Sequence, residues 1–411
     1  MTAGGTPEIR RVAVVSDYSM TTLGGAETAY FEQVRTLGTR FEVTAMSPEC
    51  PKLSLLGSYP GVTAVPVPVW FRVPNLGLPV ARNTAALRRF FEREFRTRRI
   101  DVVHLHSEFA VAAAALAAAK SLRIPVVETV HTFFWQTRWP IQHLLALGTP
   151  NYHRFVTGLK PSKAVLDASP GNSALRNMTL TVAREVDRVI SPSSHQARRL
   201  VEAGLQRVDV IPNTMAFPPG AEPLTEAGPP LRLVWIGRFV AEKRILPFVL
   251  ACVAALKRLP QGALEVDILG DGEQHKAAVA LAEAFPQIRF QGRVPHDRVQ
   301  QLISAAHISV LTSIGWDNQP MTVVEAITAL RGVIYCDPEL TEGLQGPGIP
   351  AFGDELVLAN VIVRLAQRPG EVIAASHAAV EARAEFGVQT FLNRTAACYA
   401  AAAQRVAGNP G

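Results

Sequence analysis

The sequence predicts an α/β protein built from two doubly wound parallel sheets that face each other across a cleft. Three observations support this fold class. Apolar segments of strand length alternate with helical segments throughout. The alternation occurs in two series, separated by a proline-rich stretch. At 411 residues, with 48% hydrophobic and 18% charged, the chain is long enough to bury more than one core.

The first series contains seven candidate strands with helical segments between most of them. The strands are expected at 12–16, 41–45, 62–67, 101–105, 126–130, 188–191 and 208–211. The longest apolar stretch, 109–119, is shorter than the roughly 20 residues that span a bilayer. We therefore expect no membrane-spanning helix.

The stretch 212–230, rich in proline and small residues, is the best linker. The second series follows it, with strands expected at 231–236, 264–269, 288–291, 308–312 and 333–336. The predicted domains are therefore 1–212 and 213–386. A C-terminal helix over about 387–411 is expected to pack back on the first domain.

The N-terminus and the cysteines indicate a reducing compartment. The run M-T-A-G-G-T-P-E-I-R-R lacks an apolar core, so a signal peptide is not expected and the cytoplasm is the default location. Cys50, Cys252, Cys336 and Cys398 form no C-x-x-C pair, which favours buried free thiols. The mean hydropathy of +0.14 is typical of a soluble globular protein.

The formal charge of +6 is concentrated between residues 82 and 99, where seven arginines stand against Glu92 and Glu94. At 100° per residue the segment divides into two faces. One face carries Val80, Thr84, Leu87, Phe91 and Phe95, and the opposite face carries Arg82, Arg89, Arg93 and Arg96. The arginines form either a solvated helix surface or a patch that docks on an anionic membrane surface. We expect no nucleic-acid partner, because no binding motif or stacking aromatics accompany the charge.

Asp317 and Glu325, separated by seven residues, follow the apolar strand H-I-S-V-L-T and lead into a helix. They bracket backbone amides at the helix start, which suits a diphosphate flanked by two hydroxyl-bearing rings. A nucleotide sugar has that shape. The alternative is helix capping, with Asn318 as the cap, Pro320 at the first helical position and Glu325 in the first turns.

Glycines follow two other predicted strands. Gly24 and Gly25 open a helix, where backbone amides can approach a phosphate without an intervening Cβ. Gly270 lies in the run L-G-D-G-E at a similar junction. In both places a tight turn without a ligand is the alternative.

Two cations, Arg238 and Lys243, follow the first strand of the second series in W-I-G-R-F-V-A-E-K. There they can neutralise a diphosphate and the charge that develops on it as a leaving group. Ordinary loop charges are the alternative. Val294, at the end of a later strand, can lie against a nucleotide base.

His131 ends the strand V-V-E-T-V and can hydrogen-bond a sugar hydroxyl or stabilise charge. A structural histidine is the rival interpretation. His104 and His106, at the preceding strand end, are more ambiguous.

Taken in order, these motifs resemble the family 4 retaining glycosyltransferases, which have the GT-B fold of two Rossmann-like domains. The matching runs are G-G-A-E, V-H-T, I-P-N, G-R-F-V-A-E-K, L-G-D-G-E and S-x3-D-x7-E-A, spread from about residue 12 to residue 336. The stretches H-S-E-F and V-E-T-V-H-T-F-F also look like bacterial members that glycosylate diacylglycerol or phosphatidylinositol. The aromatics Phe133, Phe134, Trp135 and Trp139 would suit a lipid acceptor.

The resemblance implies a role for each matching residue. Arg238 and Lys243 would hold the donor diphosphate, with phosphate contacts from the amides of Met321 and Thr322. Glu325 would bind the ribose hydroxyls. From the first domain, Gly25 would approach the diphosphate and His131 would contact the donor sugar. Asp317 would stand in the first acidic position of the catalytic pair.

The resemblance further implies hexosyl transfer from a nucleotide sugar, UDP-linked by preference, with retention of configuration and without a metal or other cofactor. The departing phosphate would help to deprotonate an acceptor lipid or small molecule. A lipid acceptor would make the enzyme peripheral on the inner face of the membrane. Two positions depart from the family pattern: the first acid is Asp317 rather than glutamate, and Pro320 replaces a glycine. Both departures are expected to affect recognition of the donor sugar more than recognition of the nucleotide.

Several alternatives stay open. The acceptor could be a soluble metabolite or a polysaccharide precursor. An epimerase or phosphorylase on the same fold is a second class, although no cofactor lysine or pair of elimination acids is identifiable. A non-catalytic nucleotide-sugar binder is the third.

Overall fold

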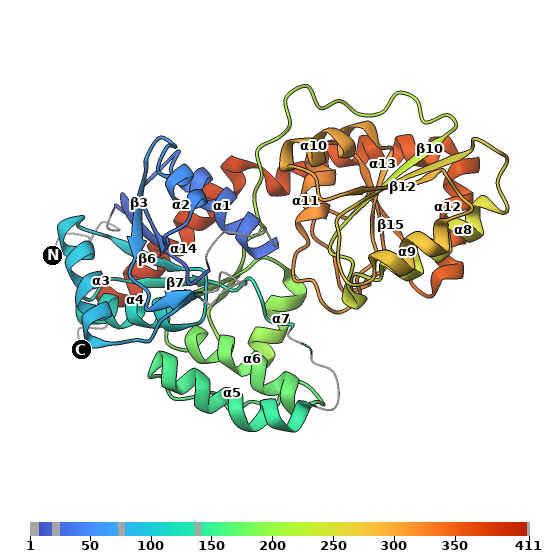
Figure 1. The fold of residues 1–411 in the computed structure, drawn as a ribbon. Coiled ribbons are helices and arrows are strands. Elements are labelled where there is room, and N and C mark those ends of the chain that lie inside the picture. Colours follow the sequence, from blue (N-terminus) through green and yellow to red (C-terminus); the bar gives the residue numbers. More distant parts are fainter. Residues whose placement is uncertain (1–7, 19–24, 73–78, 135, 137–140, 409–411) are drawn as a thin grey trace. The chain divides into compact units, whose positions relative to one another are not determined.

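The computed structural model describes residues 8–18, 25–72, 79–134, 136 and 141–408 (Figure 1). The chain divides into two compact units, one formed by Met1–Thr214 with Phe391–Gly411 and the other by Met215–Thr390. The sequence analysis placed the corresponding boundaries at 212/213 and 386/387.

The first unit is a parallel sheet in the order β3-β2-β1-β6-β7-β8-β9. Its strands are β1 (Arg11–Val15), β2 (Glu42–Pro48), β3 (Val62–Val67), β6 (Val102–Leu105), β7 (Val126–Thr129), β8 (Arg188–Ser191) and β9 (Val208–Val210). Its helices are α1 (Gly25–Leu37), α2 (Pro51–Leu56), α3 (Ala85–Thr97), α4 (Ala110–Ser121), α5 (Gln142–Thr157), α6 (Pro170–Ala183) and α7 (Ser194–Glu202). All seven predicted strands are present. The short hairpin of β4 (Phe71–Arg72) and β5 (Pro79–Val80) was not predicted.

The second unit repeats the pattern, with strands in the order β12-β11-β10-β13-β14-β15. Its strands are β10 (Leu231–Ile236), β11 (Leu264–Leu269), β12 (Ile288–Gly292), β13 (Ile308–Leu311), β14 (Gly332–Tyr335) and β15 (Gly348–Pro350). Its helices are α8 (Ile245–Leu256), α9 (His275–Ala282), α10 (His296–Ala305), α11 (Met321–Thr328), α12 (Glu355–Gln367) and α13 (Pro369–Ala382), with the 3-10 turns η1 (Ala241–Lys243) and η2 (Arg383–Phe386). This is the order of a doubly wound sheet. The predicted fold class is confirmed; only β15, a three-residue edge strand, was missed.

The last helix, α14 (Val388–Gly408), returns to the first unit, where Figure 1 shows it in red among the blue elements. Tyr399 on α14 is fully buried, and its hydroxyl lies 2.8 Å from Nδ1 of His104 on β6. Arg405 donates to the backbone oxygen of Asp187 at 3.2 Å. The end of the chain thereby completes the core of the first unit.

The arginine-rich helix is shorter than the sequence analysis expected. Thr84 is the N-cap of α3, and its hydroxyl accepts from the amide of Leu87 at 3.2 Å. Val80 belongs to β5 and Arg82 precedes the helix, so assigning these two residues to its faces was wrong. Within α3 the apolar face is buried, and Arg89, Arg93 and Arg96 are exposed as predicted.

Of two aromatics expected at a lipid surface, one is buried in the core and the other is half-buried against it. Phe133 is 2% exposed in the main core, so its assignment to a surface was wrong. Phe134 stacks on His195, with ring centroids 5.1 Å apart. Trp135 and Trp139 lie outside the described residues.

The cysteines are buried and free, as predicted. None of the helices in the described ranges has both the length and the apolar character needed to cross a membrane.

Candidate functional site

The residues predicted to bind the donor follow four neighbouring strands of the second sheet. Because β12, β11, β10 and β13 pair in parallel, their carboxyl ends lie at one edge. Arg238 and Lys243 follow β10, Gly270 follows β11, Val294 follows β12 and Asp317 follows β13. Ligands of doubly wound sheets bind at this edge.

Lys243 and Asp317 are in direct contact across this edge. The Lys243 ammonium donates to Oδ1 of Asp317 at 2.5 Å, and the side chains are only 23% and 15% exposed. Ser313 Oγ donates to the other carboxylate oxygen. Thr312 Oγ1 donates to the backbone oxygen of Lys243 at 2.6 Å, which ties the two loops together. The sequence analysis predicted both charged residues but not their pairing.

Arg238 is held more loosely. Its guanidinium lies 3.7 Å from Oε1 of Glu242, and its side chain is 71% exposed. Ion pairs this exposed contribute little to stability, so the guanidinium can exchange partners at small cost.

Helix α11 begins one residue later than the capping interpretation required. Pro320 is the N-cap, with φ −70° and ψ 123°, and Met321 is the first helical residue. Placing Asn318 at the cap and Pro320 at the first helical position was therefore wrong. The extended ψ of Pro320 keeps it outside the helix. Glu325 lies in the second turn, 6% exposed, with Oε1 3.8 Å from Nδ1 of His296.

The start of α11 offers polar groups to a ligand. Met321 and Thr322 are its first two residues, and amides at these positions have no acceptor inside a helix. The Thr322 hydroxyl is buried and has no hydrogen-bond partner among the residues that the structure describes. Buried hydroxyls are normally satisfied, so this atom is a candidate contact for a bound phosphate or sugar.

Gly270 has a structural reason to be glycine. Its φ is +126°, and a Cβ there would lie 1.9 Å from the carbonyl oxygen of Gly237. In the first unit, a Cβ on Gly25 at the start of α1 would meet no described atom within 4 Å. Gly24 lies outside the described residues. Close packing therefore accounts for Gly270 but not for Gly25.

Three histidines gather at the ends of β6 and β7. His106 Nδ1 lies 2.8 Å from Nε2 of His131, with the rings stacked at 5.0 Å. His104 Nε2 lies 2.7 Å from the hydroxyl of Thr129. Burial lowers the pKa of His131 to about 4 and that of His104 to about 3, and it holds the pKa of His106 well below its usual range. At neutral pH His131 is therefore uncharged and acts as a hydrogen-bonding group rather than a cation.

A buried acid that the sequence motifs did not single out lies beside this cluster. Glu108 precedes α4, and burial, with a smaller contribution from Asp17, raises its pKa to about 8. Its carboxyl group lies 3.3 Å from the hydroxyl of Thr132 and 3.4 Å from that of Tyr18. The only sequence signal was its place in the run H-S-E-F at a strand end. The raised pKa favours the protonated form at neutral pH, and in that form Glu108 can donate a hydrogen bond.

Asp17 has a structural role. Its carboxylate accepts from the amides of Val111 and Ala112 at 2.6 and 3.0 Å and from Ser107 Oγ at 2.8 Å. It therefore caps α4 from a different loop. In the described part of the chain, no three histidine, cysteine or carboxylate side chains are placed to share a metal ion. Metal-free chemistry stays a prediction.

Two family models match the chain. Residues 23–215 match Glycosyltransferase Family 4, and residues 222–339 match Glycosyl transferases group 1. The two matched regions fall in the two halves that the sequence analysis distinguished.

Among curated proteins, the chain is similar to alpha-monoglucosyldiacylglycerol synthase of Acholeplasma laidlawii, with 29% identity over 151 residues. The similar stretch spans 36% of this chain and 36% of that protein. The resemblance to lipid glycosyltransferases is thereby supported over about a third of the relative's length.

Solved structures share the fold over nearly the whole chain. Anabaena Alr3699/HepE in complex with UDP has a TM-score of 0.66 at 17% identity, covering 94% of this chain and 98% of that one. The pneumococcal O-GlcNAc transferase GtfA in complex with UDP and GlcNAc has a TM-score of 0.66 at 14% identity, covering 98% and 100%. At such low identity the likeness concerns the fold, and it identifies this as the GT-B fold.

Proposed function

Since the chain belongs to the family 4 glycosyltransferases, we propose that it transfers a hexosyl group from a UDP-linked sugar to a hydroxyl of a membrane lipid, with retention of configuration. The observation that carries the donor half of this proposal is the contact of Lys243 with Asp317 at the carboxyl edge of the second sheet. The first turn of α11 follows Asp317 closely and offers amides and an unsatisfied hydroxyl.

In this proposal the second unit binds the donor. Arg238 and Lys243 contact the diphosphate, and the amides of Met321 and Thr322 add hydrogen bonds at the positive end of α11. Glu325, buried in the second turn, accepts from the ribose hydroxyls. Gly270 follows β11 and Val294 follows β12, where the proposal places the nucleoside.

Transfer then proceeds on one face of the sugar. The bond from the anomeric carbon to the diphosphate oxygen breaks while the acceptor oxygen bonds to the same carbon. The acceptor proton passes to the departing phosphate. Arg238 and Lys243 stabilise the negative charge on the leaving group. His131, neutral because burial lowers its pKa to about 4, donates or accepts a hydrogen bond at the donor sugar.

The acceptor half of the proposal is supported by the relative named for a monoglucosyldiacylglycerol product. A diacylglycerol-type lipid would place the enzyme on the inner face of a membrane as a peripheral protein. The proposal includes no metal; Arg238 and Lys243 supply the positive charge beside the diphosphate.

A second candidate is a nucleotide-sugar binder without turnover. It is favoured by Asp317, which is shorter than the glutamate of the family pattern and already engaged by Lys243 and Ser313. Radiolabelled UDP-sugars incubated with the protein and a lipid extract separate the two. Label in the lipid phase supports the transferase, and saturable binding without transfer supports the binder. If neither UDP nor GDP raises the melting temperature, both proposals fail.

A further inference from the structure

Helix α5 carries a row of large apolar side chains that are exposed to solvent. They are Leu144 and Leu147, 71% and 74% exposed, with Tyr152 and Phe155, 57% and 54% exposed, and Ile141 at the N-cap, 49% exposed. At 100° per residue they lie within an arc of roughly 140°. We call these five residues the α5 stripe.

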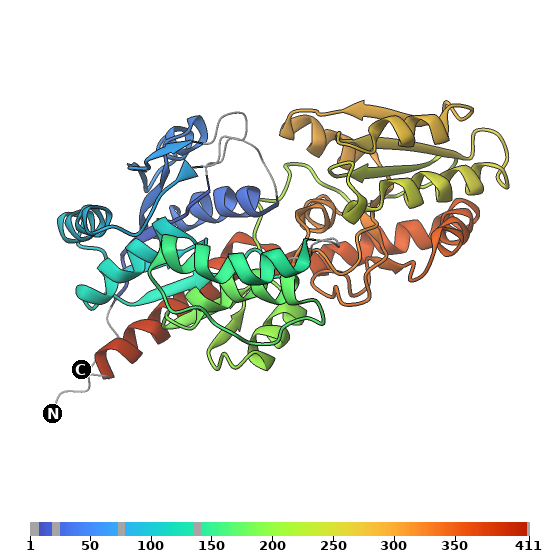
Figure 2. The same ribbon diagram turned by 60° about the horizontal axis from the view of Figure 1, so that its bottom comes forward.

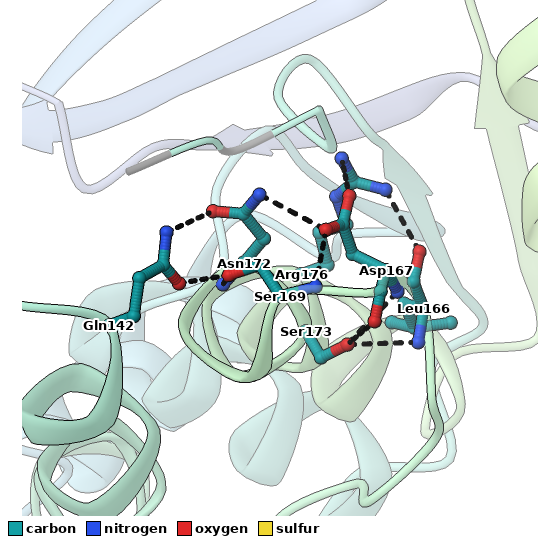
Figure 3. A network of polar contacts seen from close by, with 7 residues as sticks. All are labelled: Gln142, Leu166, Asp167, Ser169, Asn172, Ser173 and Arg176. Carbon is teal, nitrogen blue, oxygen red and sulfur yellow. Dashed lines mark hydrogen bonds and ion pairs between the residues drawn. The ribbon is translucent and has the colours of Figure 1, made fainter. Parts of the chain in front are cut away.

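The opposite side of α5 is fixed to α6. Figures 1 and 2 show the two helices side by side, and Figure 3 shows Gln142 of α5 reaching Asn172 of α6 and Ser169, the N-cap of α6. Gln142 accepts from Ser169 Oγ, and its amide nitrogen lies 3.5 Å from Oδ1 of Asn172. Asp167 of the connecting loop pairs with Arg176 of α6 at 2.8 Å. The stripe is therefore presented on an anchored helix.

His153 gives α5 a second attachment on its buried side. Its Nε2 lies 2.7 Å from the backbone oxygen of Glu108. Thr149 and Val156 are buried on the same side, at 7% and 5% exposure. The stripe is thus exposed on a helix whose opposite side is packed against the unit.

The surroundings of the stripe are basic. Arg82 lies over the ring of Phe155 at 4.3 Å, and its Nε donates to the Phe155 carbonyl at 3.1 Å. Asn83 bonds to the carbonyls of Val156 and Thr157. The start of α3 is thereby joined to the end of α5.

These two joined segments carry charge of one sign. Residues 79–91 and 141–165 contain six lysines and arginines and no aspartate or glutamate. All six are exposed: Arg82, Arg88, Arg89, Arg154, Lys160 and Lys163. Val165, beside the two lysines, is 91% exposed.

We propose that the α5 stripe and the cations around it form a docking surface for an anionic lipid bilayer, with α5 lying in the plane of the interface. The inference rests on the proposed function, which needs access to a membrane lipid. An apolar helix face with exposed cations on the same helix, on the segment that follows it and on the segment joined to it matches anionic head groups above acyl chains. A second copy on the same surface would place like charges together, which disfavours self-association.

The test compares vesicles of phosphatidylcholine alone with vesicles that also contain phosphatidylglycerol, using sedimentation of the full chain at low salt. The double variant Leu144→Ser/Leu147→Ser should bind the anionic vesicles at least about tenfold less tightly, since each leucine loses apolar area that the bilayer would cover. The matched control is Leu356→Ser on α12, a leucine 61% exposed in the other unit, which should leave binding unchanged. Lys160→Gln/Lys163→Gln should weaken binding about fivefold or more at low salt and little at high salt.

Equal vesicle binding by the Leu144/Leu147 variant and the unmodified protein would overturn the inference. Equal binding of the parent to neutral and anionic vesicles would also overturn it. So would light scattering that showed a dimer for the parent and a monomer for the Leu144→Ser/Leu147→Ser variant, because the leucines would then join two copies. Melting temperatures of both double variants should match that of the parent, because the side chains are exposed.

A sugar-transfer assay distinguishes the failure of this inference from the failure of the proposed function. Transfer to a detergent-dispersed short-chain acceptor should persist in the Leu144→Ser/Leu147→Ser variant. If the parent protein binds anionic vesicles but transfers no sugar, and the Leu144→Ser/Leu147→Ser variant no longer binds these vesicles, the proposed function fails and the docking surface stands.

Discussion

Replacing Asp317 by asparagine tests how the Lys243–Asp317 pair serves the donor. The Asp317 carboxylate is 2.5 Å from the Lys243 ammonium, so a diphosphate that binds Lys243 must approach an existing negative charge. Asparagine keeps the shape and an oxygen for Ser313 Oγ but removes the charge. We expect the variant to bind UDP more tightly and to transfer sugar more slowly.

The magnitude follows from the geometry. Two unit charges about 5 Å apart repel by about 3 kcal/mol at an effective dielectric constant of 20 and by about 0.8 kcal/mol in water. The two side chains are 23% and 15% exposed, which places the site between these limits. A repulsion of about 1–2 kcal/mol corresponds to a dissociation constant for UDP lowered roughly 5- to 30-fold.

Lys243→Met is the comparison variant, because it removes the cation of the pair instead of the acid. It removes a charge-assisted hydrogen bond of about 1.5–3 kcal/mol, so UDP should bind about 10- to 150-fold more weakly. Calorimetric titration of UDP into both single variants and the double variant gives the coupling between the two side chains. If Asp317→Asn weakened UDP binding as much as Lys243→Met, the acid would be positioning the lysine, and the reasoning would be refuted.

Further predictions concern other parts of the chain. Asp317→Glu should change the preference among UDP-sugars more than the affinity for UDP, measured by competing donors. The pH profile of kcat/KM should show no histidine inflection near 6.5, because the pKa of His131 is lowered to about 4 and protonation reduces activity only as the pH approaches that value. Glu108→Gln should leave the free energy of unfolding unchanged at pH 3.5, well below both pKa values, and raise it at pH 9 by up to about 5 kcal/mol in urea denaturation, because the folded-state pKa of about 8 exceeds the ordinary 4.5 and stability is lost as pH rises between them. Gly270→Ala should lower the melting temperature by about 6–12 °C, from a clash costing about 3 kcal/mol. Gly292→Ala, where φ is +67° and no described atom lies within 4 Å, should lower it by only a few degrees.

Three results would contradict this group. An inflection near pH 6.5 that disappears in His131→Gln would show a histidine with an ordinary pKa. A Glu108→Gln variant less stable than the parent at pH 9 would mean that the carboxylate is held ionised by a partner. Equal melting temperatures for Gly270→Ala and Gly292→Ala would show that close packing does not explain why residue 270 is glycine.

The regular elements could be predicted because their signals are local. A strand buried on both faces, such as 12–15 (V-A-V-V) in β1, is a run of apolar residues that can be recognised without knowledge of its neighbours. The boundaries shifted where a cap or a side-chain contact decided them. Because Thr84 is the N-cap of α3, Arg82 lies before the helix. Because Pro320 has an extended ψ, α11 begins one residue later than predicted.

The charged residues of the site could also be predicted, but their pairing could not. Lys243 and Asp317 lie 74 residues apart and meet because β10 and β13 are neighbours, which is a property of the sheet order. The low pKa of His131 depends on burial that no short motif encodes. Whether these residues bind a donor stays a prediction.

The return of α14 has a consequence for how the protein is made. Thr129 and His104 of the first unit form a hydrogen-bonded chain with Tyr399, which is synthesised after the whole second unit. A nascent chain that has released residues 1–214 still lacks the helix that closes its first core. The histidine cluster that includes His131 therefore reaches its final arrangement only late in translation. A chain shortened before Phe391 would keep the whole second unit and lack most of the helix that closes the first.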